Sequence, residues 1–170
     1  MKLFVIYIGG SHEKSLIELH DMRFVISDTI EQTYDELRKS WWGIPKSLHI
    51  DAFGELHYAD GHRIYVTNNM PKKQSKNRLF FINLGGYSQS EFTELHKNVF
   101  VVAENEEQAK LKAKTQIQQW ELPHKDYLYE LDNILDISQI TAQENVHVYL
   151  EPTTEFQEFE FTCRYTPIGK

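Results

Sequence analysis

The strongest constraint on this chain is an internal repeat with a spacing of 76 residues. The segment Leu3–Gly10 (LFVIYIGG) returns as Leu79–Gly86 (LFFINLGG). Aligned without a gap, residues 2–26 and 78–102 are identical at ten of 25 positions. The pattern predicts a tandem duplication, in which two copies of one folding unit follow each other in a single chain. Both apolar runs end at a glycine pair and are typical of strands buried on two faces.

The first copy is predicted to contain a helix that begins at Asp28. Asp28 and Glu31 have the spacing of a capping box, in which two side chains satisfy exposed backbone N–H groups. Gly43 suits the left-handed position after a helix, and Pro45 prevents the helix from resuming. The apolar stripe expected to face the sheet consists of Ile30, Tyr34, Leu37 and Trp41.

The second copy is expected to follow the same plan. Asp60-Gly61 in the first copy has the composition of a tight hairpin turn. In the second copy Glu104 or Asn105 is expected to cap a helix. The buried stripe of that helix is predicted to be Ala109, Ala113, Ile117 and Trp120.

The last part of the chain is predicted to be extended. Later strands are expected within residues 127–137, where Asp132 corresponds to Asp51, and within residues 146–150. In the tail, alternating positions predict an extra strand that closes a sheet edge, with an inward face formed by Phe159, Phe161, Cys163 and Tyr165. Cys163 is therefore expected to be a small apolar core residue and not a nucleophile.

These elements together predict an α+β fold. It is a tandem duplication of a β-β-α-β-β unit with pseudo-twofold symmetry, followed by a C-terminal edge strand, and each helix covers one face of a sheet. The expected organisation is one compact unit with four segments: a first repeat (1–67), a linker (68–77), a second repeat (78–150) and a C-terminal extension (151–170).

Composition indicates an ordinary globular protein. The chain has 170 residues, of which 41% are hydrophobic, and no stretch approaches the length that spans a bilayer. The apolar run near the amino terminus recurs in mid-chain, so it is expected to be a buried strand and not an export signal. A single cysteine excludes an intrachain disulfide and fits a reducing compartment. We expect a soluble, cytoplasmic protein without membrane association.

The charge argues against binding to nucleic acid. The formal net charge is −7, whereas nonspecific nucleic-acid binding needs a basic surface. The one basic cluster lies where the linker is predicted, and its polar neighbours are typical of a solvated connector. That cluster consists of Lys72, Lys73, Lys76 and Arg78.

The repeated motifs also resemble a known family. The Gly-Gly end of the first strand, the Glu-Leu-His element and the following Phe-Val strand are similar to the bacterial domain of unknown function 1543, which occurs in one or two copies per chain. The resemblance covers about residues 2–67 and 78–150, and Glu94–Val102 (ELHKNVFVV) is a fairly distinctive part of it. It implies the boundaries of the repeats and no particular activity.

The repeated Glu-Leu-His elements are the candidate site. In extended backbone Glu18 and His20 lie on one face, as do Glu94 and His96. A carboxylate beside an imidazole can orient it, take part in acid–base chemistry or supply metal ligands. An approximate twofold axis could bring all four residues together as a shared divalent-metal site, although the sequence requires no cofactor. A purely structural role, with each ring hydrogen-bonded locally, is the competing interpretation and the favoured one.

The glycine pairs are secondary candidates for ligand binding. They either form turns or let the backbone approach another group closely, and turn geometry is the preferred interpretation because no phosphate-loop pattern surrounds them. The pairs are Gly9 with Gly10 and Gly85 with Gly86. The remaining histidines lack zinc-motif spacing and are predicted to be surface or locally hydrogen-bonded residues: His49, His57, His62, His124 and His147.

Two functions are compatible with these features. The sequence favours a noncatalytic binding module that receives a small molecule or a basic protein partner, because nothing in it demands catalysis. The alternative is a metal-dependent enzyme that uses the paired Glu-Leu-His elements. The sequence assigns no oligomeric state.

Overall fold

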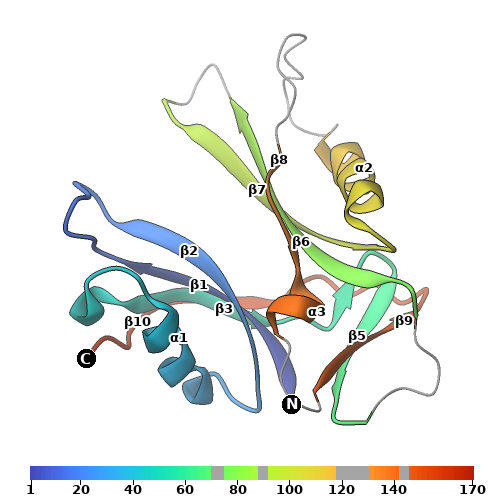
Figure 1. The fold of residues 1–170 in the computed structure, drawn as a ribbon, viewed down its shortest axis with the longest axis horizontal. Helices are drawn as coiled ribbons and strands as arrows, with labels where there is room; N and C mark the ends of the chain where they lie inside the picture. The colour runs from blue at the N-terminus through green and yellow to red at the C-terminus, as the bar shows by residue number, and fades with distance from the viewer. Residues whose placement is uncertain (70–74, 88–91, 118–130, 142–145) are drawn as a thin grey trace.

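The computed structural model describes residues 1–69, 75–87, 92–117, 131–141 and 146–170, which are mostly β-sheet with few helices (Figure 1). The strands are β1 (Lys2–Gly10), β2 (Leu19–Ser27), β3 (His49–Glu55), β4 (Tyr58–Ala59), β5 (His62–Thr67), β6 (Arg78–Tyr87), β7 (Glu94–Ala103), β8 (Leu131–Asp136), β9 (His147–Pro152) and β10 (Phe161–Pro167). The helices are α1 (Tyr34–Ser40), α2 (Glu106–Ile117) and α3 (Ile137–Ile140), with 3-10 turns η1 (Glu31–Thr33) and η2 (Pro45–Ser47).

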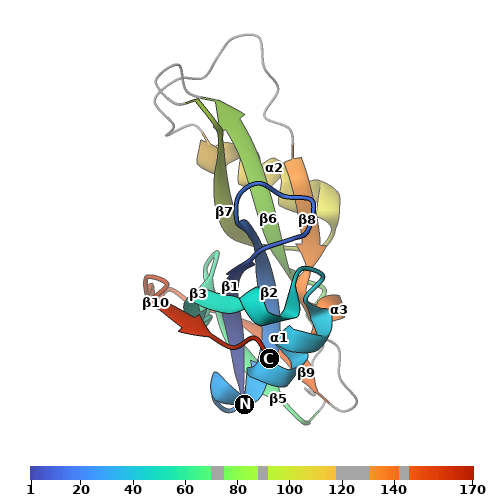
Figure 2. The same cartoon turned by 90° about the vertical axis from the view of Figure 1, so that its left-hand side faces the viewer.

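The described strands form three antiparallel sheets. The first has the order β10-β3-β1-β2, the second β7-β6-β8 and the third β4-β5-β9. The second sheet stands above the first in both views of the fold (Figures 1 and 2). The third sheet joins distant parts of the chain, because β5 pairs with β9 along its whole length. The expected C-terminal edge strand is confirmed as β10, which extends the first sheet beside β3.

The first two sheets are built on the same pairing scheme. β1 lies between β2 and β3, and β6 lies between β7 and β8. The register of β1 against β3 shifts between Tyr7 and Ile8, and that of β6 against β8 shifts between Asn83 and Leu84. In each case one residue of the outer strand is left without a partner, as in a β-bulge. Those unpaired residues are Asp51 in β3 and Asp132 in β8.

The continuous apolar run of β1 is explained by burial on both faces. Phe4 and Ile6 pack in a cluster with α1, while Leu3 and Val5 face the opposite way. β6 repeats this arrangement against α2. The faces of β1 and β6 that turn away from the helices meet in one central cluster, which contains Leu3, Val5, Phe24, Ile26, Leu56, Ala59, Ile64, Leu79, Phe81, Val102, Ile137 and Leu150. Side chains from all three sheets therefore share one core.

Each long helix covers the outer face of a sheet, as predicted. From α1 and its end, Leu37 and Trp41 are buried in the cluster with β1. In α2 the buried residues are Ala109 and Ala113, and Asn105 accepts a hydrogen bond from the backbone N–H of Gln108 at 3.0 Å. The predicted stripe and cap are thus confirmed for these residues. The predicted stripe member Trp120 and the side chain of Ile117 lie outside the described residues.

The predicted capping box of the first helix is wrong. Glu31 begins the 3-10 turn η1, and no side chain caps it. The Asp28 carboxylate instead pairs with the amino-terminal ammonium group of Met1 at 3.0 Å. Gln32 takes the role predicted for Glu31: its side-chain oxygen accepts hydrogen bonds from the Asp28 N–H at 3.3 Å and from the Ser27 hydroxyl at 3.0 Å. A charged partner at the amino terminus outcompetes the local backbone amides.

Two further predictions are corrected by close contacts and exposure. Gly43 is not in the left-handed region; a Cβ there would lie 2.5 Å from the carbonyl oxygen of Ser11, so glycine is needed for space. Cys163 is exposed and not in the core, because β10 is an edge strand whose side chains are largely uncovered.

The hairpin prediction is confirmed: Asp60 and Gly61 have φ of 46° and 72° between β4 and β5.

Other bounds differ by a few residues. β8 ends at Asp136, where the chain turns into α3, and residues 127–130 of the predicted strand lie outside the described ranges. β9 continues to Pro152. Within the described ranges, no helix is both long enough and apolar enough to cross a membrane.

We predict that the central cluster holds the whole fold together. Phe81 is 3% exposed and contacts the ring of Phe24 at a centroid distance of 5.0 Å. Phe81→Ala should lower the free energy of unfolding by about 3–5 kcal/mol, measured by denaturant titration. Phe92, which is 104% exposed, offers the matched control, and Phe92→Ala should change the value by no more than about 0.5 kcal/mol. Equal effects of the two substitutions would contradict the assignment of the core.

Candidate metal centre

The end of β1 brings two histidines to the same face of the first sheet. Gly9 pairs with His20 of β2 on one side and with His49 of β3 on the other. Residues directly opposite each other in a sheet point to the same face. β2 begins at Leu19, so the extended backbone that the Glu-Leu-His prediction required is present from Leu19 onward. The sheet thus places two imidazoles on either side of a position without a side chain.

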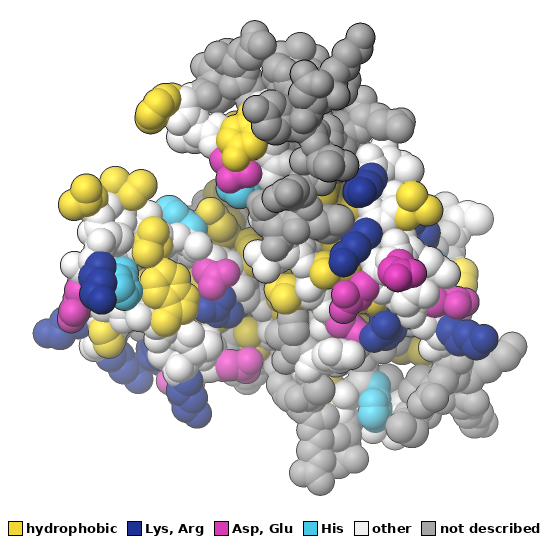
Figure 3. Space-filling model, turned by 45° about the horizontal axis from the view of Figure 1, so that its top comes forward, with side chains coloured by type: hydrophobic (Ala, Val, Ile, Leu, Met, Phe, Trp, Pro, Cys, Tyr) yellow, Lys and Arg dark blue, Asp and Glu magenta, His cyan; other side chains and the backbone are white. Residues whose placement is uncertain are grey.

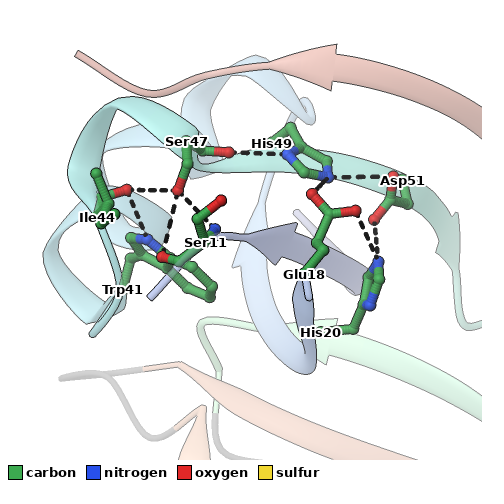
Figure 4. A network of polar contacts seen from close by, with 8 residues as sticks. All are labelled: Ser11, Glu18, His20, Trp41, Ile44, Ser47, His49 and Asp51. Atoms are coloured by element: carbon green, nitrogen blue, oxygen red, sulfur yellow. Dashed lines mark hydrogen bonds and ion pairs between the residues drawn. The ribbon is translucent and has the colours of Figure 1, made fainter. Parts of the chain in front are cut away.

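Two carboxylates complete this cluster, which we call the His20–His49 centre: Glu18, His20, His49 and Asp51 (Figure 4). The Nε2 atom of His49 lies 3.2 Å from Glu18 Oε1 and 3.4 Å from Asp51 Oδ1. The Nε2 atom of His20 lies 3.6 Å from Glu18 Oε2 and 3.3 Å from Asp51 Oδ2. Each carboxylate therefore contacts both imidazoles. Asp51 reaches this position because it is the bulged residue of β3.

Gly9 makes room for the centre. A Cβ atom at this position would lie 2.7 Å from His49 Nε2, 2.8 Å from Asp51 Oδ2 and 2.9 Å from His20 Cδ2. Gly9 and Gly10 both lie within β1, so the preferred turn interpretation of this pair is wrong. The other expected role, close approach of the backbone to another group, is the one observed.

His49 is held in one orientation and one tautomer. Its side chain is 3% exposed, and Nδ1 lies 2.8 Å from the carbonyl oxygen of Ser47. Because a carbonyl can only accept, Nδ1 carries the proton and donates it. Ser47 is fixed in turn, since its hydroxyl accepts from the N–H of Ser11 at 2.8 Å and donates to the carbonyl of Ile44 at 2.7 Å (Figure 4). In the neutral ring the lone pair of Nε2 then points into the centre.

The contacts of His49 Nε2 with two carboxylates favour a cation in the centre. In the neutral tautomer the Nε2 lone pair of His49 faces oxygens of two carboxylates. Among the described residues, the buried side-chain polar atoms without a hydrogen-bond partner are His49 Nε2 and Asp51 Oδ2. Buried polar atoms without a hydrogen bond are costly. A cation bound at His49 Nε2 removes its repulsion with the carboxylate oxygens.

Two tyrosines line the centre. The ring of Tyr7 stacks on His20 at a centroid distance of 5.1 Å and an interplanar angle of 6°. The ring of Tyr165 lies 4.5 Å from that of His49. Burial raises the pKa of the Tyr7 phenol, and the negative charges of Asp51 and Asp21 raise it further. The Tyr7 phenol is therefore held in its neutral form beside His20.

The donor set fits a divalent transition metal. Ligand atoms of Glu18, His20 and His49 all lie within 4.8 Å of one another. The N–O separations of 3.2–3.6 Å compare with about 3.3 Å between neighbouring ligands in a tetrahedral site with bonds of about 2.05 Å. Imidazole nitrogen suits Zn²⁺, Cu²⁺, Fe²⁺ and Ni²⁺, and carboxylates also suit Mn²⁺, whereas Mg²⁺ and Ca²⁺ prefer sites made of oxygen alone.

Comparison with known proteins places this centre in a family. Residues 15–66, which contain the whole centre, match the family described as Domain of Unknown Function (DUF1543). The crystal structure of a protein Il1583 from Idiomarina loihiensis is similar over 99% of both chains, with 33% sequence identity and a TM-score of 0.74. The chain belongs to the DUF1543 family. None of the curated proteins matches it.

The second Glu-Leu-His element of this DUF1543 chain lies in β7. His96 pairs with Gly85 of β6, and its Nε2 atom lies 3.9 Å from Glu94 Oε2. Gly85 and Gly86 both lie within β6. By strand alternation, His20 and His96 lie on the faces of their sheets that also form the central cluster. The space-filling surface is hollowed between the first and the second sheet (Figure 3).

The structure does not assemble the predicted four-residue site within the described residues. The group that could hold one ion contains neither Glu94 nor His96. Asn83 stands where the first sheet has Tyr7, 76 residues earlier. In the sequence, Glu130 precedes Asp132 by two residues, as His49 precedes Asp51, and Glu130 lies outside the described residues.

The sequence analysis missed His49 and Asp51. His49 was predicted to be a surface or locally hydrogen-bonded residue; its Nδ1 is locally bonded, but the ring is buried and Nε2 points into the centre. The alternation His49-Ile-Asp51 has the same spacing as Glu18-Leu-His20, which was an available signal. It could not be recognised as part of the site without knowing that β2 and β3 flank β1.

We predict that the pKa of Tyr7 depends on the charge of Asp51. Removing that charge by Asp51→Asn makes the phenolate less unfavourable, so the pKa should fall toward its ordinary value while burial keeps part of the increase. The measurement is the phenolate absorbance during an alkaline titration. Tyr7→Phe variants in both backgrounds isolate Tyr7 from the other eight of the nine tyrosines. An unchanged Tyr7 titration in Asp51→Asn would contradict the coupling.

Proposed function

We propose that this protein is a binding module whose ligand is a divalent transition-metal ion, held by Glu18, His20 and His49 with Asp51 beside them. The observation that carries the proposal is the Nε2 atom of His49. It is buried, has no hydrogen-bond partner and lies 3.2 Å and 3.4 Å from oxygens of two carboxylates. A metal ion bound to Nε2 and to a carboxylate replaces that repulsion with attraction.

The second element of the proposal is the origin of the site. We infer that the two β-sheets built on β1 and β6 are copies of one unit related by pseudo-twofold symmetry. The 76-residue repeat, the shared strand order and the bulges at Asp51 and Asp132 support this. In this account only the first copy binds the ion, since the second has Glu130 in place of His49.

The proposal is tested by thermal denaturation with Zn²⁺, Mn²⁺, Co²⁺ or Mg²⁺ present. An ion that binds the native state at 100 times its dissociation constant adds about 2.7 kcal/mol, or roughly 5–10 °C in melting temperature. We expect that gain with the transition metals and little with Mg²⁺, because two ligands are imidazoles. His49→Ala should abolish the gain.

His96→Ala is the matched control. It removes the histidine of the corresponding motif in the second sheet and should keep the full response to the ion. Loss of the response in both variants would support the predicted shared site of the two Glu-Leu-His elements. No response in the unaltered protein to any transition metal would refute the proposal.

Gly9 supplies a second test, of the geometry. In Gly9→Ala the added methyl group would occupy the space between the two imidazoles and Asp51, where contacts of 2.7–2.9 Å leave no room. We expect loss of the stabilisation by the ion, together with a cost of about 1–3 kcal/mol to the ion-free protein from overpacking. Circular dichroism confirms folding, and calorimetry measures binding. Ion binding of unchanged strength would show that the ion lies elsewhere.

A metal-dependent enzyme is the second candidate, favoured by the accessibility of the site. The side chains of His20 and Glu18 are 34% and 46% exposed, so solvent reaches the outer side of the centre. Catalytic metal sites keep an open position, whereas structural ones are closed by protein ligands. Metal-dependent turnover of an ester or phosphoester panel, lost in His49→Ala and kept in His96→Ala, would favour the enzyme.

A further inference from the structure

The four contacts of the His20–His49 centre use four different carboxylate oxygens. His49 Nε2 contacts Glu18 Oε1 and Asp51 Oδ1, at 3.2 Å and 3.4 Å. His20 Nε2 contacts Glu18 Oε2 and Asp51 Oδ2, at 3.6 Å and 3.3 Å. The centre thus divides into two sets of three donors, each with one imidazole nitrogen, one glutamate oxygen and one aspartate oxygen (Figure 4).

We propose that the centre holds two divalent transition-metal ions, bridged by the carboxylates of Glu18 and Asp51. His49 is the nitrogen ligand of one ion and His20 that of the other. This inference rests on the proposed metal binding and specifies the number of ions and the role of each carboxylate.

The buried atoms without hydrogen bonds favour two ions over one. The group able to hold a single ion consists of Glu18, His20 and His49 and does not include Asp51. One ion in that group uses His49 Nε2 and leaves Asp51 Oδ2 buried without a partner. With two ions, His49 Nε2 belongs to the first and Asp51 Oδ2 to the second. Both buried atoms then bind an ion.

Carboxylate bridging and the exposure of the two histidines suit this arrangement. A carboxylate that bridges through its two oxygens suits metal ions about 3.5–4 Å apart, the usual spacing of two-metal sites. The inner set contains His49, whose side chain is 3% exposed, and the outer set contains His20, at 34%. The two ions therefore differ in access to solvent, and the outer one should exchange faster.

The number of bound ions tests the proposal. The full chain is loaded with Mn²⁺, passed through a desalting column and analysed for metal content, with calorimetric titration as an independent count. We expect two ions per chain in the unaltered protein and in His96→Ala. His20→Gln and His49→Gln should each retain one. Electron paramagnetic resonance should show coupled Mn²⁺ ions in the unaltered protein and an isolated ion in each glutamine variant.

The outcomes separate this inference from the proposed function. One ion per chain, lost in both glutamine variants, would overturn the two-ion centre and leave metal binding intact. Two ions that persist in both variants, or that show no magnetic coupling, would place them elsewhere and overturn it as well. No bound ion in the unaltered protein would refute both proposals. Because His20 is partly exposed, His20→Gln should fold normally, and circular dichroism checks this for each variant.

Discussion

Two-sided burial of β1 and β6 is the constraint on which the rest of the structure depends. Each strand pairs with a neighbour on both edges and buries side chains on both faces. A slip of one residue in β1 would exchange Phe4 and Ile6, which face α1, with Leu3 and Val5, which face the central cluster. Different side chains form the two clusters, so the register is fixed. The helices and the third sheet pack against surfaces that these strands define.

The same register creates the His20–His49 centre. At the end of β1 the apolar side chains stop and Gly9 follows, so the alternation that buried Leu3 and Val5 now leaves an empty position. The neighbours of Gly9 on β2 and β3 fill it with imidazoles. Ser47 fixes one of these rings, and the carboxylates of Glu18 and Asp51 approach both rings from the sides. Along β1, the residues that build the core are thus followed directly by the glycine around which the candidate site forms.

Local patterns were sufficient to predict many elements. The apolar run of β1, the helical stripe that includes Leu37 and the Asp60-Gly61 turn depend on neighbours within a few residues. The capping of the first helix and the exposure of Cys163 did not follow the sequence pattern. They depend on the position of the Met1 ammonium group and on what covers β10, and both are set by distant parts of the chain.

The sequence by itself determined that β1 and β6 are buried strands, that a helix follows each strand pair, and that Glu18 and His20 share a face. Their periodicity is a local property of the backbone. Only the tertiary structure decided that β5 pairs with β9 and that His49 and Asp51 join Glu18 and His20. That assembly requires β2 and β3 to flank β1 and a bulge to turn Asp51 inward. Strand order and bulges arise from packing between segments far apart in the chain, which residue spacing does not encode.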